Sequence, residues 1–129
     1  MKKIPLFTIA LLFSLASNAQ FTFQNIGLLG HFDDTTVAAE PVYGIRYQAC
    51  WGWVHPTTLH EYGVIGSTAG TYILDVTDPT NPIETDYIPH RQTDAIWHEY
   101  KTFGNYLYII SDDGGNNSLQ IADLSTLPD

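Results

Sequence analysis

Two stretches of this chain carry the same pattern, and this repeat limits the folds that the sequence can adopt. A strand-like run that begins near Tyr62, a turn, and a second run that ends at Asp75 are echoed by runs at Tyr106 and Asp123. The step is 44 residues between the tyrosines and 48 between the aspartates, because the second turn is longer. Repeats of roughly 40–45 residues are typical of the blades of a propeller. The sequence therefore predicts a repeat array of the β-propeller type.

Strands and turns account for nearly all of the chain after its first residues. Apolar and polar residues alternate over 43–49, and this period of two is typical of a half-buried strand. Further strands are expected over residues 51–54, 61–66, 72–76, 83–88, 97–103, 106–111 and 119–124. No run of useful length with helical periodicity accompanies them, so the fold class is expected to be all-β.

About two blades can be built from these strands. The first extends from Tyr43 to Ile88, and the second opens at Trp97 and lacks an outer strand. Closed propellers hold about 4–8 blades, so we expect residues 20–129 to be a repeat region that is incomplete at its C-terminus, a fragment of a larger propeller. The alternative is a short chain that closes its ring by self-association. Because unpaired strand edges recruit other strands, the edge near residues 119–124 is expected to make the fragment self-associate.

The first 19 residues have the features of a signal peptide. Two lysines precede an apolar run over 4–15, and the small residues over 16–19 fit cleavage before Gln20. The apolar run is too short to span a bilayer, which takes about 20 residues. The sequence therefore predicts a secreted protein, extracellular or at the cell surface, with no transmembrane segment. An N-terminal anchor that is never cleaved is the alternative.

The repeat is also similar in its residues to that of a known family. The run Ile73-Leu-Asp-Val-Thr-Asp-Pro-Thr-Asn-Pro82 resembles the LVIVD repeat, in which a hydrophobic strand ends in Asp-Val-Ser/Thr-Asp-Pro and an Asn-Pro follows. Over residues 25–129 the chain resembles the choice-of-anchor B family of secreted bacterial proteins. The other matching motifs are Leu28–Asp34, Cys50–Val54, Gly70-Thr71, Trp97 with Lys101-Thr102, and Ser111-Asp112. The resemblance implies a secreted β-propeller-like domain, and it carries over no established catalytic residue.

Acidic residues outnumber basic ones by a wide margin. The chain has 14 Asp and Glu against 5 Lys and Arg, and its net charge is -9. Removal of residues 1–19 takes two lysines away and leaves a net charge of -11. Such a charge repels nucleic acid and anionic membranes and favours cations or basic partners. Because the acids are scattered along the chain, a solvated acidic surface is the simpler explanation.

Four residues are candidate metal ligands. His31 and Asp33 lie in a short run of one imidazole and two carboxylates, and His55 and His98 could join them from distant strands. None of the tight spacings that mark zinc sites is present, so surface or hydrogen-bonded histidines are the alternative. The oxygen-rich run 112–117 is expected to be a hairpin turn, because it lacks the ligand spacing of a calcium-binding EF-hand. No cofactor is expected, with calcium or zinc as the exception.

The three tryptophans allow two interpretations. Trp51 and Trp97 stand 46 residues apart at the heads of the two repeats, and both are expected to be buried between strands. Trp53 or Trp97 could instead be an exposed platform on which a sugar or peptide group stacks. Cys50, the single cysteine, excludes an internal disulfide and is expected to be a small buried hydrophobe.

These features together predict a non-catalytic binding or scaffold module of the β-propeller type at the cell exterior. A protein or glycan is the expected kind of ligand, and nucleic acid is not an expected partner. The rival hypothesis is a metal-dependent extracellular hydrolase or lyase that uses the His and Asp residues named above as ligands.

Overall fold

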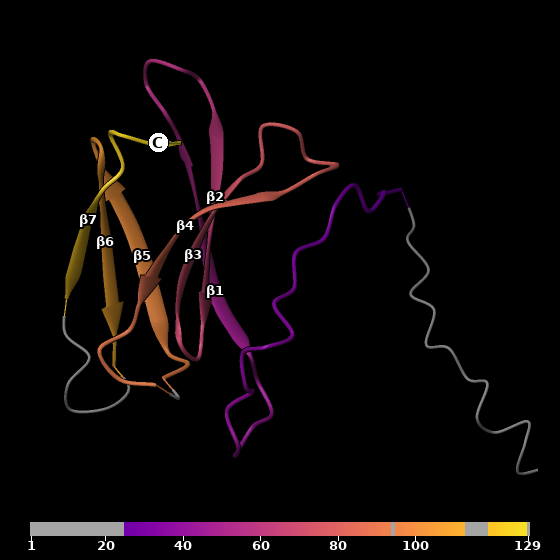
Figure 1. Cartoon of the computed structure of the whole chain (residues 1–129), viewed down its shortest axis with the longest axis vertical. Coiled ribbons are helices and arrows are strands. Elements are labelled where there is room, and N and C mark those ends of the chain that lie inside the picture. The colour runs from indigo at the N-terminus through magenta and orange to yellow at the C-terminus, as the bar shows by residue number, and fades with distance from the viewer. Residues whose placement is uncertain (1–24, 94, 113–118, 129) are drawn as a thin grey trace, which may run out of the picture.

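Seven β-strands in two antiparallel sheets form the described part of the chain (Figure 1). The computed structural model describes residues 25–93, 95–112 and 119–128, so the predicted signal peptide lies outside them. The first sheet has the sequential order β1 (Tyr47–Val54), β2 (Glu61–Ser67), β3 (Gly70–Asp75) and β4 (Ile83–Pro89). The second sheet has the same kind of order, with β5 (His98–Phe103), β6 (Tyr106–Ser111) and β7 (Gln120–Asp123). Each sheet is therefore a meander in which neighbours in sequence are neighbours in space.

The all-β prediction is confirmed, because the described residues contain no helix. In that same part of the chain, accordingly, no helix has the length and apolarity needed to cross a membrane. The expected strand at 43–49 is wrong in its first half, since β1 begins only at Tyr47. The Glu40 carboxylate accepts hydrogen bonds from the backbone N–H groups of Val42 (2.9 Å) and Tyr43 (2.7 Å). This side chain holds the segment in a turn, which prevents it from extending into the sheet.

The pairing registers show that the sequence repeat is also a structural repeat. Tyr62 pairs with Asp75 between β2 and β3, and Tyr106 pairs with Asp123 between β6 and β7. Each aspartate accepts a hydrogen bond from the backbone N–H two residues later, at 2.8 Å in the first sheet and 2.9 Å in the second. In both sheets the backbone N–H of the residue after the aspartate also donates a hydrogen bond of 2.8 Å to the carbonyl of the residue before the tyrosine. Positions in one sheet can therefore be matched to positions in the other.

The hydrophobic core lies between the two sheets. Its buried members from the first sheet are Trp53, Tyr62, Val64 and Ile73, and those from the second sheet and the segment after it are Tyr100, Leu107, Ile109, Leu124 and Leu127. Gly66 is part of the same contact, because a side chain there would collide with the backbone oxygen of Gln48 (2.6 Å) and with His98 Cδ2 (2.9 Å). The sheets thus pack face to face through β1, β2 and β3 of the first and β5 and β6 of the second.

Strands β1 and β5 face each other along a line that we call the seam. The Trp51 indole donates a hydrogen bond to Thr102 Oγ1 (3.0 Å), and the Trp53 indole donates one to the Gly104 carbonyl (3.1 Å). From the first bond to the second, the residue number rises by two on both sides, from Trp51 to Trp53 and from Thr102 to Gly104, so β1 and β5 run parallel. Side chains therefore join the two edge strands, and within the described residues no backbone pairing merges the sheets into one.

Residues before β1 cover the face of the first sheet that points away from the second. The Phe32 ring lies 5.1 Å from that of Tyr72, centroid to centroid, and the Tyr72 hydroxyl donates to Asp34 Oδ2 (2.8 Å). Gly30 lies against the turn between β3 and β4, where an added Cβ would be 2.8 Å from Pro82 Cδ. The N-terminal part of the described chain is therefore fixed to β3.

Two predictions about side-chain burial are wrong. Trp97 is 45% exposed, whereas it was expected to be buried like Trp51, which is partly buried. The register explains this difference, because the counterpart of Trp51 in the second sheet is Lys101, and Trp97 lies just before β5. Cys50 is exposed. It follows a bulge in β1, where Ala49 has a φ of 61°, and it alternates with the inward-facing Trp51.

Candidate functional site

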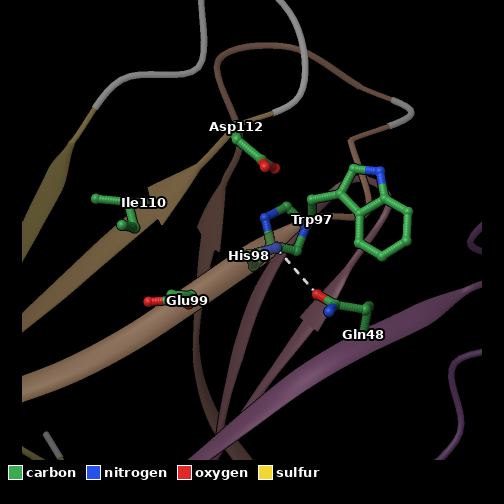
Figure 2. A pocket seen from close by; sticks show the side chains of 6 residues that line it. All are labelled: Gln48, Trp97, His98, Glu99, Ile110 and Asp112. Carbon is green, nitrogen blue, oxygen red and sulfur yellow. Dashed lines mark hydrogen bonds between the residues drawn. The ribbon is translucent and has the colours of Figure 1, made fainter.

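A shallow pocket opens at the start of β5, beside one end of the seam (Figure 2). Its volume is about 320 Å³, and its lining residues are Gln48, Trp97, His98, Glu99, Ile110 and Asp112. These residues come from β1, from the beginning of β5, and from the end of β6. The pocket is therefore assembled from both sheets.

The exposed Trp97 ring is the largest apolar element of this pocket. One edge of the ring lies near Tyr43, with the two ring centroids 6.3 Å apart and the planes at 70°. The Trp97 carbonyl accepts a hydrogen bond from the Asp112 backbone N–H (3.2 Å), which ties the end of β6 to this residue. The backbone is thus held in place while nearly half of the Trp97 surface remains accessible.

Polar groups line the rest of the pocket. The Gln48 side-chain oxygen accepts a hydrogen bond of 2.9 Å from the His98 backbone N–H, so the amide is fixed across the seam (Figure 2). Glu99 and Asp112 are both exposed and present carboxylates. An aromatic surface beside hydrogen-bonding groups of this kind can bind a sugar ring or a polar peptide side chain.

Two histidines and two hydroxyl groups form a polar cluster behind the pocket. His90 and His98 have ring centroids 4.5 Å apart, and the His98 Nε2 donates to the Ala95 carbonyl (2.9 Å). Thr71 Oγ1 lies 3.4 Å from His90 Nε2 and 3.1 Å from the Tyr100 hydroxyl. These contacts join β3 to β5 within the interior.

Two members of the cluster, His90 and Tyr100, are uncharged near neutral pH. Burial, together with the neighbouring His98, lowers the pKa of His90 to about 4. Burial also raises the pKa of Tyr100 to about 12, against the hydrogen bond with Thr71, which lowers it. Neither group is therefore poised to exchange a proton at pH 7, and the contacts of the cluster are those of a packed polar interior.

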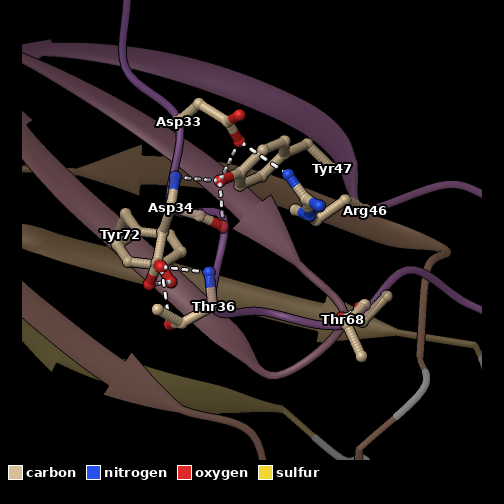
Figure 3. A network of polar contacts seen from close by, with 8 residues as sticks. Asp33, Asp34, Thr36, Arg46, Tyr47, Thr68 and Tyr72 are labelled. Atoms are coloured by element: carbon tan, nitrogen blue, oxygen red, sulfur yellow. Dashed lines mark hydrogen bonds and ion pairs between the residues drawn. The ribbon is translucent and has the colours of Figure 1, made fainter.

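The four candidate metal ligands lie in different surroundings. His31 is exposed, and Asp33 Oδ1 accepts hydrogen bonds from Arg46 Nη1 (2.9 Å) and the Tyr47 hydroxyl (3.0 Å) (Figure 3). His55 Nδ1 accepts from two backbone N–H groups of its own turn, each at 3.1 Å, and His98 belongs to the polar cluster. Across residues 25–93, 95–112 and 119–128, no three His, Cys, Asp or Glu side chains come together as a metal site would require.

The carboxylates near residue 33 anchor the N-terminal segment. Asp34 accepts hydrogen bonds from Thr36 Oγ1 (2.6 Å) and from Tyr72, and these two bonds, in that order, lower its pKa (Figure 3). Burial and the hydrogen bond with Asp34 raise the pKa of Tyr72. On the same segment, the Ala38 carbonyl accepts a bond of 2.6 Å from Thr68 Oγ1. The arrangement explains these acids as structural groups.

The two candidate platform residues have opposite environments. Trp53 is 9% exposed and packs in the core, with its ring 5.7 Å from that of Tyr62, so a ligand has no access to its face. Trp97 is accessible at the pocket. Residues 113–117 of the oxygen-rich run lie outside the described residues, so the expectation of a turn there stays a prediction.

Three pocket residues could not be linked to Trp97 by sequence reasoning. Gln48, Ile110 and Asp112 are 49, 13 and 15 residues away from it along the chain. Strand pairing brings the last two beside it, and the hydrogen bond across the seam brings the first. No local sequence motif indicates that these residues lie beside Trp97.

In comparisons with known proteins, no family model, no curated protein and no solved structure matches this chain.

Proposed function

We propose that this chain is a non-catalytic binding module of the β-propeller type that works outside the cell and binds its ligand at the Trp97 pocket. The accessible indole beside the Glu99 and Asp112 carboxylates is the observation that carries the proposal. Exposed tryptophans are otherwise uncommon, because the ring stabilises a fold most when it is buried. A glycan is the favoured ligand, since a sugar ring can stack on the indole while its hydroxyls donate to the carboxylates.

Three features support the propeller type. Both sheets are sequential meanders, their registers repeat, and the parallel strands β1 and β5 lie next to each other along the seam. Four-stranded meanders arranged around an axis with their first strands inside are the architecture of propellers. The likeness to the LVIVD repeat and to the choice-of-anchor B family points in the same direction.

The location rests on the N-terminal sequence. The two lysines, the apolar run over 4–15 and the small residues over 16–19 support export and cleavage before Gln20. N-terminal sequencing of the exported protein tests this step, and a product that still begins with Met1 would contradict it. The metal-dependent hydrolase or lyase has no observation in its favour among the described residues.

Glycan binding can be tested with the purified chain and an immobilised panel of neutral and cationic oligosaccharides. For any oligosaccharide that binds, we expect Trp97→Ala to weaken the affinity at least about tenfold, which corresponds to roughly 1.4 kcal/mol. Tyr106→Ala is the matched control, because Tyr106 is exposed to nearly the same extent, 47% against 45%, and lies at the start of β6, whereas the pocket is lined by residues near the end of β6. The proposal fails if no member of the panel binds or if Trp97→Ala and Tyr106→Ala behave alike.

A further inference from the structure

The second sheet exposes an apolar surface on the side that points away from the first sheet. We call this surface the outer face; its apolar members are Phe103, Tyr106, Tyr108, Ile110 and Ile121. Phe103 is 79% exposed and Ile121 is 56% exposed. A hollow of about 360 Å³ lies on it, lined in part by Phe103, Tyr106 and Tyr108. Charged side chains flank the apolar ones on this face, Glu99 and Lys101 on β5 and Asp123 on β7. An exposed apolar patch with a polar rim usually marks a place where another molecule binds.

The repeat shows how the equivalent surface of the first sheet is used. Phe103 pairs with Tyr106 just as Trp53 pairs with Tyr62 at the same place in the first sheet. Trp53 and Tyr62 are only 9% and 2% exposed, because the second sheet packs on them. The second sheet makes this contact with its other face, which carries Leu107 and similar residues. The two sheets therefore stack head to tail, through unlike faces, and the outer face is where the next element in this order would pack.

A second group of exposed apolar side chains lies at the opposite end of the molecule. Ile26, Leu28 and Leu29 are 71%, 66% and 63% exposed, and we call residues 26–29 the apolar N-terminal segment. This segment leads directly into the residues that cover the far face of the first sheet through Phe32. In Figure 1 the indigo segment and β7 lie on opposite sides of the first sheet, so the two apolar groups of one chain do not meet.

We propose that copies of this chain associate head to tail, with the outer face of one copy packed against the apolar N-terminal segment of a second copy. The contact continues the stacking order that the two sheets already follow within one chain, and the hollow beside Phe103 can receive a leucine side chain. It joins unlike surfaces and leaves one of each kind free, so further copies can add. The proposal rests on packing alone and does not depend on the ligand of the Trp97 pocket.

The size of the outer face determines how strong the association between copies is expected to be. Three strands at about 4.8 Å spacing and six residues at about 3.3 Å rise cover roughly 14 Å by 20 Å. Stable complexes bury about 800 Å² on each partner, so we expect an association that depends on protein concentration. Sedimentation velocity of the purified chain should show monomers at low concentration and larger species at high concentration.

Two charged substitutions identify the surfaces. Ile121→Asp on the outer face and Leu28→Asp in the apolar N-terminal segment should each abolish association at concentrations where the parent associates. Leu59→Asp is the matched control, because Leu59 is 69% exposed and lies on neither surface; it should associate like the parent. Urea melts of each variant show whether the fold is retained, and Phe103→Asp and Leu29→Asp serve as second variants of the two surfaces.

Mixing the two defective variants is the decisive experiment. Each keeps the surface that the other lacks, so an equimolar mixture should form a 1:1 dimer and nothing larger. A like-to-like contact cannot be restored in this way. The proposal is overturned if the parent is monomeric at all concentrations, if the surface variants of either kind still associate, or if the mixture remains monomeric.

Discussion

Replacing Trp53 by alanine should bring the protein close to unfolding, whereas the same change at Phe103 should have a small effect. The two residues occupy equivalent register positions, each paired with a tyrosine, but Trp53 is 9% exposed and Phe103 is 79% exposed. The comparison therefore measures what packing between the sheets contributes at one and the same site of the repeat.

The expected magnitudes follow from the buried areas. A tryptophan side chain offers up to about 250 Å², and burying nine-tenths of it at about 25 cal/mol per Å² stabilises by roughly 5–6 kcal/mol, which is an upper estimate. Measured Trp→Ala substitutions in cores cost about 3–5 kcal/mol, and we expect Trp53→Ala to fall at the upper end, because the Gly104 carbonyl also loses its donor. Phe103 buries about a fifth of a smaller ring, so Phe103→Ala should cost about 1 kcal/mol or less.

Urea unfolding at low micromolar concentration, followed by circular dichroism, is the appropriate assay. Since whole domains are stable by about 5–15 kcal/mol, Trp53→Ala should lose most of its cooperative transition, and Phe103→Ala should unfold nearly like the parent. Equal costs at the two positions would refute the assignment of Phe103 to an exposed outer face.

Three further outcomes are expected. Gly66→Ala should destabilise the protein by about 1–3 kcal/mol or more, since the new methyl group would collide with Gln48 and His98. Gly63→Ala is the control and should be tolerated, because its Cβ would meet only Val76, at 3.5 Å. Equal urea midpoints for the two variants would contradict this expectation. Stability should fall as the pH drops from about 6.5 towards 4, because in this window the unfolded chain protonates His90 and the folded chain, with its pKa of about 4, does not. After allowance for the partial exposure of this side chain the loss should be about 1–2 kcal/mol, and His90→Gln should remove that part of the pH dependence in urea melts; an unchanged pH profile in the variant would show that His90 is not responsible. The Cys50 thiol is exposed and should react with a thiol reagent such as Ellman's reagent in the folded protein nearly as fast as in urea; protection by more than about tenfold would show that it is buried.

Local sequence patterns predicted the strands well. The strand expected over residues 106–111 matches β6, Tyr106–Ser111, at both ends, and the repeat of Tyr62 and Asp75 at Tyr106 and Asp123 reappears as equal pairing in the two sheets. These features depend on residues that are close in sequence, and the chemistry of neighbours decides them. The failed first half of the strand at 43–49 has a local cause as well, since Glu40 holds a turn that alternation alone does not reveal.

The candidate site was less predictable, because contacts between distant strands create it. The equivalence of Trp51 and Trp97 was inferred from a step of 46 residues, but the true step between matched positions of β1 and β5 is 50, as from Trp53 to Phe103. The connection between β1 and β2 is longer than the one between β5 and β6, and this difference moves Trp97 out of the strand. A shift of four residues thus separates the partly buried Trp51 from the exposed Trp97.

The seam has a consequence for the order in which the chain folds. Pairs within each sheet join residues no more than 20 positions apart, as from Tyr47 to Ser67, whereas the hydrogen bonds of Trp51 and Trp53 across the seam span 51 positions. Closing a longer loop costs more chain entropy before any contact compensates for it. Each meander is therefore expected to form early from its own short loops, and the indole bonds of the seam to close last, so that substitutions along the seam slow the final docking step while leaving the formation of the separate sheets unchanged.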